Sequence, residues 1–359
     1  MSRAGRLAEL AAERELDALL VSDLVNLRWL TGFTGTNGLA VVEAGPDGAR
    51  IFVTDFRYVE RAVEEVGEDF ERRRGERDLL DGLGAALPGR RPLRLGFDDV
   101  HVSVRDHRRL QDVLEDVEFV PAGGLVERLR AIKDDEEIRR IRASAALADE
   151  ALRAALERGL AGRTEREVAL DIEDEMRRRG AQEPSFPSIV ASGAHGALPH
   201  AEPRDTEIPA HALVIVDWGA RLDGYCSDCT RTFATGELDG EAEEVYELVA
   251  QAQLAGLEAV RPGISGREAD AAARAVIEAA GHGERFGHGL GHGVGLAIHE
   301  DPRLSKTGEE TLSAGNVVTV EPGVYVPGRF GVRIEDLTVI TSDGVELLSS
   351  YPKDLTTIG

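Results

Sequence analysis

The chain has 359 residues and a formal net charge of −24, with 66 acidic residues against 42 lysines and arginines. This acidity excludes the basic footprint that binds nucleic-acid phosphates, so we expect no nucleic-acid partner. Without an uninterrupted apolar run near the roughly 18 residues of a membrane span, we expect no membrane partner either. The length exceeds the usual size of a single domain and predicts two domains.

The amino-terminal segment, residues 1–20, predicts an amphipathic helix that carries acidic side chains. A secretory signal would instead show a basic start, an apolar middle and a small-residue cleavage site. We therefore expect a cytoplasmic protein.

Residues 1–125 alternate helical patterns with short β-rich runs, which predicts an α/β domain. The runs lie at 16–22, 38–44, 49–55, 93–99 and 117–122. The turn-rich stretch 31–38, TGFTGTNG, could be a nucleotide-binding glycine loop. It lacks the required glycine spacing and the helix that should follow, so we interpret it as a connection only.

A long, charged, helical stretch at 126–159 marks the change to a second domain, because its apolar positions recur at helical spacing. Pro121, Gly123 and Gly124 interrupt the chain just before it. We predict a boundary between residues 121 and 134, which gives domains of 1–125 and 126–359.

The second domain shows a weak internal repeat. In each half a long helix is followed by a capping box that opens a second helix, with Thr164 and Glu167 in the first half and Ser265 and Glu268 in the second. Each half ends in a pair of β-runs: 212–220 with 224–234, and 316–326 with 331–340. A duplicated helix–helix–hairpin unit, and hence an α+β domain with a pseudo-twofold axis, accounts for this pattern.

Four carboxylates stand in these β-runs where apolar side chains would be expected: Asp217, Asp228, Glu321 and Glu335. A turn after Asp217 would fold the next run back and bring Asp228 beside it, and the repeat would treat the other two in the same way. Each carboxylate alone could pair with an arginine, since burial requires a partner. Four at matched positions cannot stay ionised together without cations, so the pattern predicts a metal centre.

Histidines support this interpretation. His288, His292 and His299 lie in the glycine-rich segment 287–302, and His200 precedes the first carboxylate-bearing run. A lone histidine is more often a structural residue. Here the glycines around His288 and His292 imply close backbone approach rather than a packing role.

The order of these motifs resembles the pita-bread metallopeptidases, the superfamily of methionine aminopeptidase, aminopeptidase P and prolidase. The resemblance spans the whole chain and rests on Asp217 with Asp228 eleven residues later, on HGLGHGVG at 288–295, and on VEPGVY and VRIED around Glu321 and Glu335. It implies a creatinase-like α/β domain followed by an α+β pita-bread catalytic domain. The segment IVASGAHGALPHAEP indicates the compact bacterial Xaa-Pro peptidases, although Cys229 replaces a common methionine.

The resemblance also implies a cofactor of two divalent metal ions. Asp217 would chelate one ion, Asp228 and Glu335 would bridge both, and His292 and Glu321 would complete the second. Oxygen-rich sites with one imidazole suit manganese, with cobalt, zinc or iron as alternatives.

Further roles are implied for the residues around the metals. His299 would stabilise the oxyanion that forms when a metal-activated water attacks the carbonyl before proline, and Glu321 would carry the proton to the leaving nitrogen. His200 would hold substrate and His288 would line the proline pocket. Arg333 would orient Glu335 and contact substrate, or form a structural pair only.

The implied substrates are peptides with proline at the second position, and similar proteins are commonly homodimers. The leading interpretation is an Xaa-Pro aminopeptidase, and a strict Xaa-Pro dipeptidase is the alternative. A dipeptidase needs an arginine for the substrate carboxylate, and Arg329 lies in a glycine-bounded turn where we expect it to be exposed. The five ligands argue against metal-free creatinase chemistry and a non-enzymatic binding module, and the N-terminal domain argues against methionine aminopeptidase.

Overall fold

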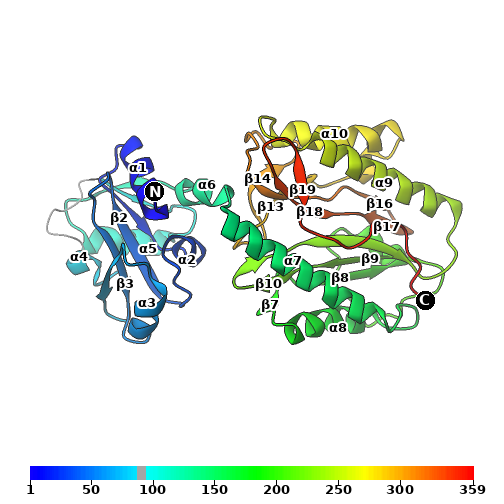
Figure 1. Ribbon diagram of the computed structural model, residues 1–359, viewed down its shortest axis with the longest axis horizontal. Coiled ribbons are helices and arrows are strands. Elements are labelled where there is room, and N and C mark those ends of the chain that lie inside the picture. The colour runs from blue at the N-terminus through cyan, green and yellow to red at the C-terminus, as the bar shows by residue number, and fades with distance from the viewer. Residues whose placement is uncertain (87–93) are drawn as a thin grey trace. The chain divides into compact units, whose positions relative to one another are not determined.

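The computed structural model describes residues 1–86 and 94–359 and divides into two compact units, 1–130 and 131–359 (Figure 1). The boundary expected at 125/126 falls at the start of helix α6 (Leu125–Ala131). This helix groups with the first unit up to Arg130, because the Arg130 guanidinium donates to the Asn26 side chain at 2.8 Å.

The N-terminal unit is built on a six-stranded sheet with the order β4-β3-β2-β1-β5-β6. The strands are β1 (Ala18–Val21), β2 (Gly38–Glu43), β3 (Arg50–Thr54), β4 (Glu71–Arg74), β5 (Arg94–Phe97) and β6 (Glu118–Pro121). The helices are α1 (Arg3–Glu13), α2 (Leu24–Thr31), α3 (Val59–Glu65), α4 (Leu83–Ala86) and α5 (Val104–Val113). Strands β1, β5 and β6 run parallel, whereas β2 is antiparallel to both β1 and β3.

The predicted α/β domain is therefore confirmed, with two differences. The helix predicted over 1–20 ends at Glu13, and β1 begins at Ala18. Strand β4 was missed because its sequence, ERRR, has no apolar residue. Leu93, the first residue of the run predicted at 93–99, lies outside the described residues. The stretch 31–38 is a connection from α2 to β2, as predicted, and Gly32 ends the helix with φ 87°.

The helical stretch predicted at 126–159 is two helices, α6 and α7 (Asp135–Leu156). The helical stretch is interrupted at Asp134, whose backbone is extended. The Asp134 side chain caps the amino end of α7 in a capping box with Glu137. Residues 132–134 therefore form a short break between the helices.

The C-terminal unit, residues 131–359, contains the predicted repeat. Helices α7 and α8 (Glu165–Arg178) pack together, as do α9 (Gly240–Ala259) and α10 (Gly266–Ala279), and both predicted capping boxes are present. Figure 1 shows the two helix pairs on opposite sides of the strands of this unit. One hydrophobic core joins α7 and α8 to the strands of the first half, and another joins α9 and α10 to those of the second.

Corresponding strands pair alike in the two halves. Those of the first half are β7 (Glu183–Pro184), β8 (Ile189–Ser192), β9 (Leu213–Trp218), β10 (Ala220–Leu222), β11 (Tyr225–Cys226) and β12 (Cys229–Ala234). Those of the second half are β13 (Gly291–Gly293), β14 (Glu300–Leu304), β15 (Val317–Val320), β16 (Gly323–Val326), β17 (Phe330–Arg333), β18 (Asp336–Ile340) and β19 (Val345–Leu347). Strand β9 pairs antiparallel with β12, and β15 with β18. Among the described helices, none is both long and apolar enough to cross a membrane.

Candidate active site

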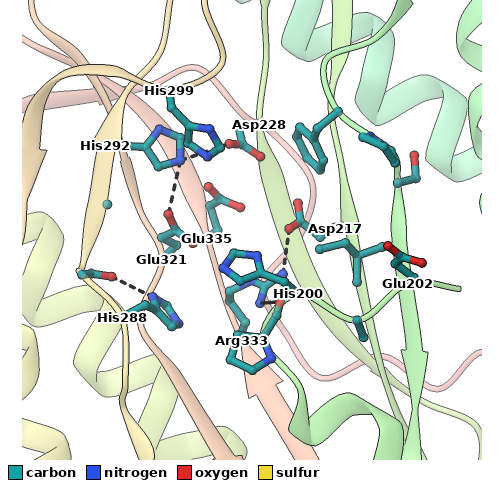
Figure 2. Close-up of a pocket in the computed structure, with 18 of the residues that line it drawn as sticks. His200, Glu202, Asp217, Asp228, His288, His292, His299, Glu321, Arg333 and Glu335 are labelled. Carbon is teal, nitrogen blue, oxygen red and sulfur yellow. Dashed lines mark hydrogen bonds and ion pairs between the residues drawn. The ribbon is translucent and has the colours of Figure 1, made fainter.

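The strand pairs of the two halves carry the predicted metal ligands. Asp217 lies in β9 and Asp228 immediately before β12, whereas Glu321 follows β15 and Glu335 precedes β18. His292 comes from β13. Figure 2 shows these side chains turned toward one another, with the two aspartates from the first half of the repeat and the other three residues from the second.

The distances show that all five side chains meet at one point. Oxygen atoms of Asp217, Asp228 and Glu335 lie within 4.8 Å of one another. The Nε2 atom of His292 lies 3.5 Å from an oxygen of Asp228 and 3.5 Å from an oxygen of Glu321. The structure therefore brings together every residue that the sequence proposed as a ligand.

The hydrogen bonding of this cluster fits cations. Among the described residues, Asp217 Oδ1 and Glu335 Oε1 are buried with no hydrogen-bond partner. Burial raises the pKa of both side chains, and it raises the pKa of Asp228 together with the charges of its carboxylate neighbours. Burial also raises the pKa of Glu321 to about 7. Buried acceptors that lack donors match the needs of bound metal ions.

His292 presents a lone pair to the same point. Its Nδ1 atom donates to the Gly293 carbonyl at 3.1 Å, because a carbonyl can only accept. Burial lowers the pKa of the ring to about 3, so the ring is neutral and Nε2 is an acceptor. An acceptor that faces two carboxylate oxygens is repelled unless a cation lies between them.

Arg333 contacts Asp217 directly, rather than Glu335 as the sequence had suggested. Its Nη2 atom donates to Asp217 Oδ2 at 2.7 Å, and its Nε atom donates to the Thr230 hydroxyl at 3.1 Å. That hydroxyl donates in turn to Glu335 Oε2 at 2.7 Å. Arg333 therefore orients one carboxylate itself and reaches the other through Thr230, a residue that the sequence did not single out.

His288 lies beside the cluster and is held by Tyr325, which sequence reasoning also missed. The His288 Nδ1 atom donates to the Gly289 carbonyl, and Nε2 accepts from the Tyr325 hydroxyl at 2.8 Å. Arg333 donates to the same hydroxyl at 2.9 Å. Burial lowers the pKa of His288 to about 4, which keeps the ring neutral and suited to an apolar ligand.

A cavity of about 1380 Å³ opens from the cluster, and His200 and His299 both line it. Each is exposed, and the ring centroid of His299 lies 4.4 Å from that of His292. Arg303, which the sequence did not identify, lines the same cavity. Partial burial and the charge of Arg303 lower the pKa of His299.

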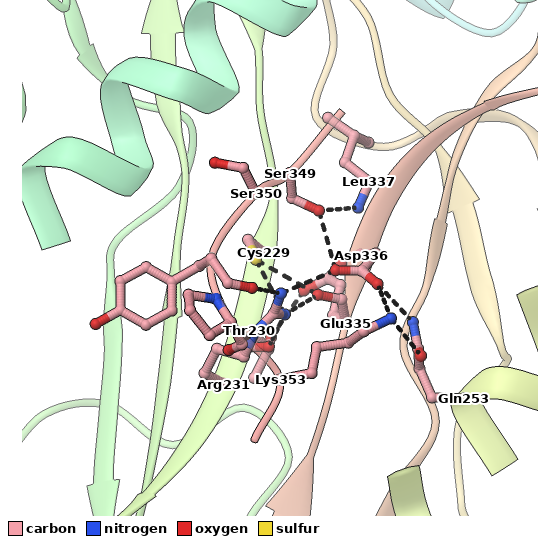
Figure 3. A network of polar contacts seen from close by, with 12 residues as sticks. Cys229, Thr230, Arg231, Gln253, Glu335, Asp336, Leu337, Ser349, Ser350 and Lys353 are labelled. Atoms are coloured by element: carbon pink, nitrogen blue, oxygen red, sulfur yellow. Dashed lines mark hydrogen bonds and ion pairs between the residues drawn. The ribbon is translucent and has the colours of Figure 1, made fainter. Parts of the chain in front are cut away.

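A second network of hydrogen bonds and ion pairs contacts the backbone of Glu335 and the side chain of the next residue, Asp336 (Figure 3). Arg231, buried in β12, donates to the backbone carbonyls of Glu335 and Tyr351 and, at 2.9 Å, to the Asp336 carboxylate. Lys353 donates to the other oxygen of Asp336 at 2.6 Å. Every residue of β12 is buried, and an arginine within such a strand needs a buried partner.

The N-terminal unit has its own cluster of candidate ligand types: Asp98, His101 and Glu127. Here the side-chain amide of Asn26 donates to Glu127 at 2.6 Å and to Asp98 at 3.3 Å, and Arg130 holds the amide oxygen. The carboxylates of Asp98 and Glu127 therefore accept hydrogen bonds from the protein itself.

Comparison with known proteins covers nearly the whole chain. The model of metallopeptidase family M24 matches residues 139–342, and that of the creatinase/prolidase N-terminal domain matches residues 3–132. An uncharacterised peptidase of Bacillus subtilis, YqhT, is 41% identical over 98% of both chains. The structure of an Xaa-Pro dipeptidase from Bacillus anthracis superimposes with a TM-score of 0.94 at 38% identity, over 99% of both chains. That of an X-Pro aminopeptidase from Thermotoga maritima superimposes with a TM-score of 0.89 at 33% identity, over 97% of this chain and 99% of that chain.

Proposed function

The chain belongs to metallopeptidase family M24, and from this membership we propose that it is a two-metal Xaa-Pro dipeptidase, which hydrolyses the bond before a carboxy-terminal proline. Its relatives support a metallo-exopeptidase acting on Xaa-Pro peptides. The choice between dipeptidase and aminopeptidase rests on Arg303 in the cavity.

Arg303 is suited to bind the carboxylate that directly follows proline in a dipeptide. It lines the cavity that holds His299. Its side chain is exposed, and within residues 1–86 and 94–359 no carboxylate forms an ion pair with its guanidinium. Arginine binds carboxylates in a bidentate manner. A dipeptide carboxylate would supply the missing partner.

Arg329 does not fill this role. It is exposed, as expected, and forms ion pairs with Asp239 and Glu241. The expectation of an aminopeptidase rested on the exposure of Arg329 alone. Arg303 offers a partner for the carboxylate of a dipeptide, and it therefore favours the dipeptidase. An aminopeptidase remains the second candidate, because a cavity of about 1380 Å³ is larger than a dipeptide requires.

The proposed metal ligands are the residues of the central cluster: Asp217, Asp228, His292, Glu321 and Glu335. When bound, two divalent cations supply Lewis-acid chemistry, which polarises the scissile carbonyl and makes a water molecule acidic enough to attack near neutral pH. One imidazole among carboxylates suits manganese, with cobalt, zinc or iron as substitutes.

The remaining residues bind the substrate and move protons. His299 is neutral near pH 7, because its pKa is lowered, and its ring N–H donates to the carbonyl oxygen as negative charge develops there. Glu321, at the edge of the metal cluster, carries the proton to the proline nitrogen. His200 holds the substrate from the cavity wall, and neutral His288 with Tyr325 forms an apolar surface for the proline ring.

A substrate comparison tests this proposal. We expect manganese-loaded protein to cleave Ala-Pro with at least about tenfold higher kcat/KM than Ala-Pro-Ala, since a charge-assisted contact contributes about 1.5–3 kcal/mol. Ala-Ala, which keeps the carboxylate and lacks the proline ring, is the control for proline specificity and should also be cleaved more slowly. Arg303→Gln should remove the preference for the dipeptide, and the matched variant Arg329→Gln should keep it. Equal cleavage of the tripeptide would favour the aminopeptidase, and cleavage of Ala-Ala as fast as Ala-Pro would exclude proline specificity.

A further inference from the structure

A buried ion pair lies next to the turn that carries His299, and the functions proposed above do not use it. Lys133 Nζ and Glu300 Oε1 are 2.6 Å apart, with side chains only 1% and 8% exposed. Lys133 comes from the break between α6 and α7, and Glu300 directly follows His299. A buried charge pair of this kind costs desolvation energy and calls for a structural or functional reason.

Glu300 fills the inside of the turn that leads from His292 to His299. Its Oε2 atom accepts from the Ala297 backbone N–H at 3.4 Å. A Cβ atom on Gly295 would lie 2.4 Å from Glu300 Oε1, so the backbone of the turn packs directly against the carboxylate. The Gly295 backbone also bonds within the turn to Ala297 at 3.0 Å. The Glu300 carboxylate therefore packs against the inside of the turn, which is also held by the Cys226 N–H bond to the Gly295 carbonyl and the Val294 N–H bond to the Val317 carbonyl.

Lys133 is itself held rigidly. Its backbone N–H donates to the Gly315 carbonyl at 2.8 Å, and its ammonium also reaches the Ala131 carbonyl at 3.4 Å. The chain has only three lysines, at 133, 306 and 353, and otherwise uses arginine. A compact ammonium at this fully enclosed position is consistent with a site too small for a guanidinium.

We propose that Lys133 is a positioning residue for His299. Through Glu300 it fixes the turn between the two histidines, and so holds the His299 ring where it donates to the developing oxyanion. This inference rests on the proposed function, which assigns that role to His299. The alternative is that the pair stabilises the fold alone.

Kinetics separate these two roles. In Lys133→Met, kcat for Ala-Pro should fall about tenfold or more, while KM changes less than about threefold and the bound metal is unchanged, as expected for an interaction made only in the transition state. Lys133→Arg should recover little activity. Lys306→Met, at an exposed lysine, is the matched control and should behave as the wild type.

A double-mutant cycle gives the sharper test. If Lys133 acts through His299, adding Lys133→Met to His299→Ala should change kcat less than about twofold, because the two substitutions remove one interaction. Multiplied effects, loss of metal in Lys133→Met, or an unchanged kcat would each overturn the inference. If Lys133→Met does not fold, the double variant Lys133→Met/Glu300→Gln carries the same test without an unpaired buried charge.

Hydrogen–deuterium exchange tests the positioning without reference to catalysis. Backbone amides in 294–300 should exchange about tenfold faster in Lys133→Met than in the wild type, and those of β9 should not change. Unchanged exchange in the turn would overturn the inference. A wild-type protein that cleaves no Xaa-Pro peptide would instead contradict the proposed function and leave the exchange result valid.

Discussion

In the part of the chain that the structure describes, histidine and carboxylate side chains gather in two clusters, one in each unit, and the clusters differ in their donors. In the N-terminal cluster the Asn26 amide donates to both Asp98 and Glu127. In the catalytic cluster Asp217 and Glu335 each keep a buried oxygen without a partner among the described residues. Residue types alone therefore do not distinguish a metal centre from a polar network, whereas the supply of hydrogen-bond donors does.

Metal removal tests this difference most directly. Purified protein should hold about two divalent ions per chain and lose all activity with a chelator, because its clustered carboxylates need neutralising charge. His101→Ala in the N-terminal cluster should leave both the metal content and the activity unchanged. Full turnover by thoroughly metal-free protein would exclude the proposed mechanism.

Substitution within the catalytic cluster should separate ligands from residues that act on substrate. Asp228→Ala and Glu335→Ala should each abolish binding of both ions and lower kcat by about a thousandfold or more, since each carboxylate is proposed to bridge the pair. His299→Ala should keep the metal and lose turnover. Metal content by atomic emission decides the point, and loss of metal in His299→Ala would show that its assigned role is wrong.

Metal affinity should weaken as the pH falls through about 7. The ions need ionised carboxylates, and burial raises the pKa of Glu321 to about 7 and raises those of its three carboxylate partners. A raised carboxyl pKa stabilises the metal-free fold below the ordinary value of 4.5 for Glu, and that stability is lost as the pH rises through the folded value. Metal-free protein should therefore lose stability, and gain metal affinity, between about pH 4.5 and 7.

This dependence can be checked by competition with a chelator at pH 6 and pH 8. We expect about a tenfold or larger increase in manganese affinity at pH 8. His292 does not oppose the trend, because its pKa of about 3 leaves the ring neutral throughout. Equal affinities at the two pH values would show that the carboxylates are already ionised without metal.

Lys353 contacts the network behind Glu335 without contacting the cluster itself. Lys353→Met would leave the buried Asp336 carboxylate with Arg231 and lose one charged partner. Because the Lys353 side chain is partly exposed, we expect a loss of about 1–2 kcal/mol in stability, less than for a fully buried pair. Thermal unfolding measures the loss. The metal stoichiometry should stay at the wild-type value, and its loss would make Lys353 part of the metal site.

Much of the fold could be predicted from the sequence, because the patterns that indicate its helices and strands lie within short stretches of the chain. Apolar β-runs located five strands of the N-terminal sheet, and paired capping boxes located the helices of the repeat. Strand β4 was not predicted because its four residues are charged. It forms a strand because it pairs with β3, and its own sequence gives no sign of this. The break before α7 had a local signal, Asp134 with Glu137, but helical periodicity on both sides concealed it.

The sequence predicted the candidate ligand residues of the site, but not the residues that hydrogen-bond to them or that line the cavity beside them. Matched carboxylates and glycine-flanked histidines predicted the gathering of the five side chains, and their metal-binding role stays a prediction. Thr230 and Arg303 carry no local pattern, and Tyr325, although it ends the motif VEPGVY, had no role predicted for it. Thr230 meets Glu335 from more than a hundred positions away in the chain, so its importance depends on tertiary pairing.

The last prediction concerns a substitution that makes the N-terminal cluster more like the catalytic one. Asn26→Asp replaces the amide that donates to Asp98 and Glu127 with a third carboxylate, so the N-terminal cluster would lose the two hydrogen bonds that this amide supplies. Without added cation, we expect a loss of about 1–3 kcal/mol in stability, because buried acceptors are left unpaired. Burial and the Glu127 charge already raise the pKa of Asp98, so further negative charge is unfavourable there.

Added manganese should restore part of that stability, because the altered cluster would have the acceptors and the charge that a cation needs. Thermal unfolding in the Asp228→Ala background would show this without interference from the catalytic centre. Asn26→Ala is the matched control: it removes the same donors without adding charge, and should lose stability with little recovery by manganese. Equal recovery in both variants would mean that missing donors alone do not make a cation site, and that the contrast between the two clusters has another cause.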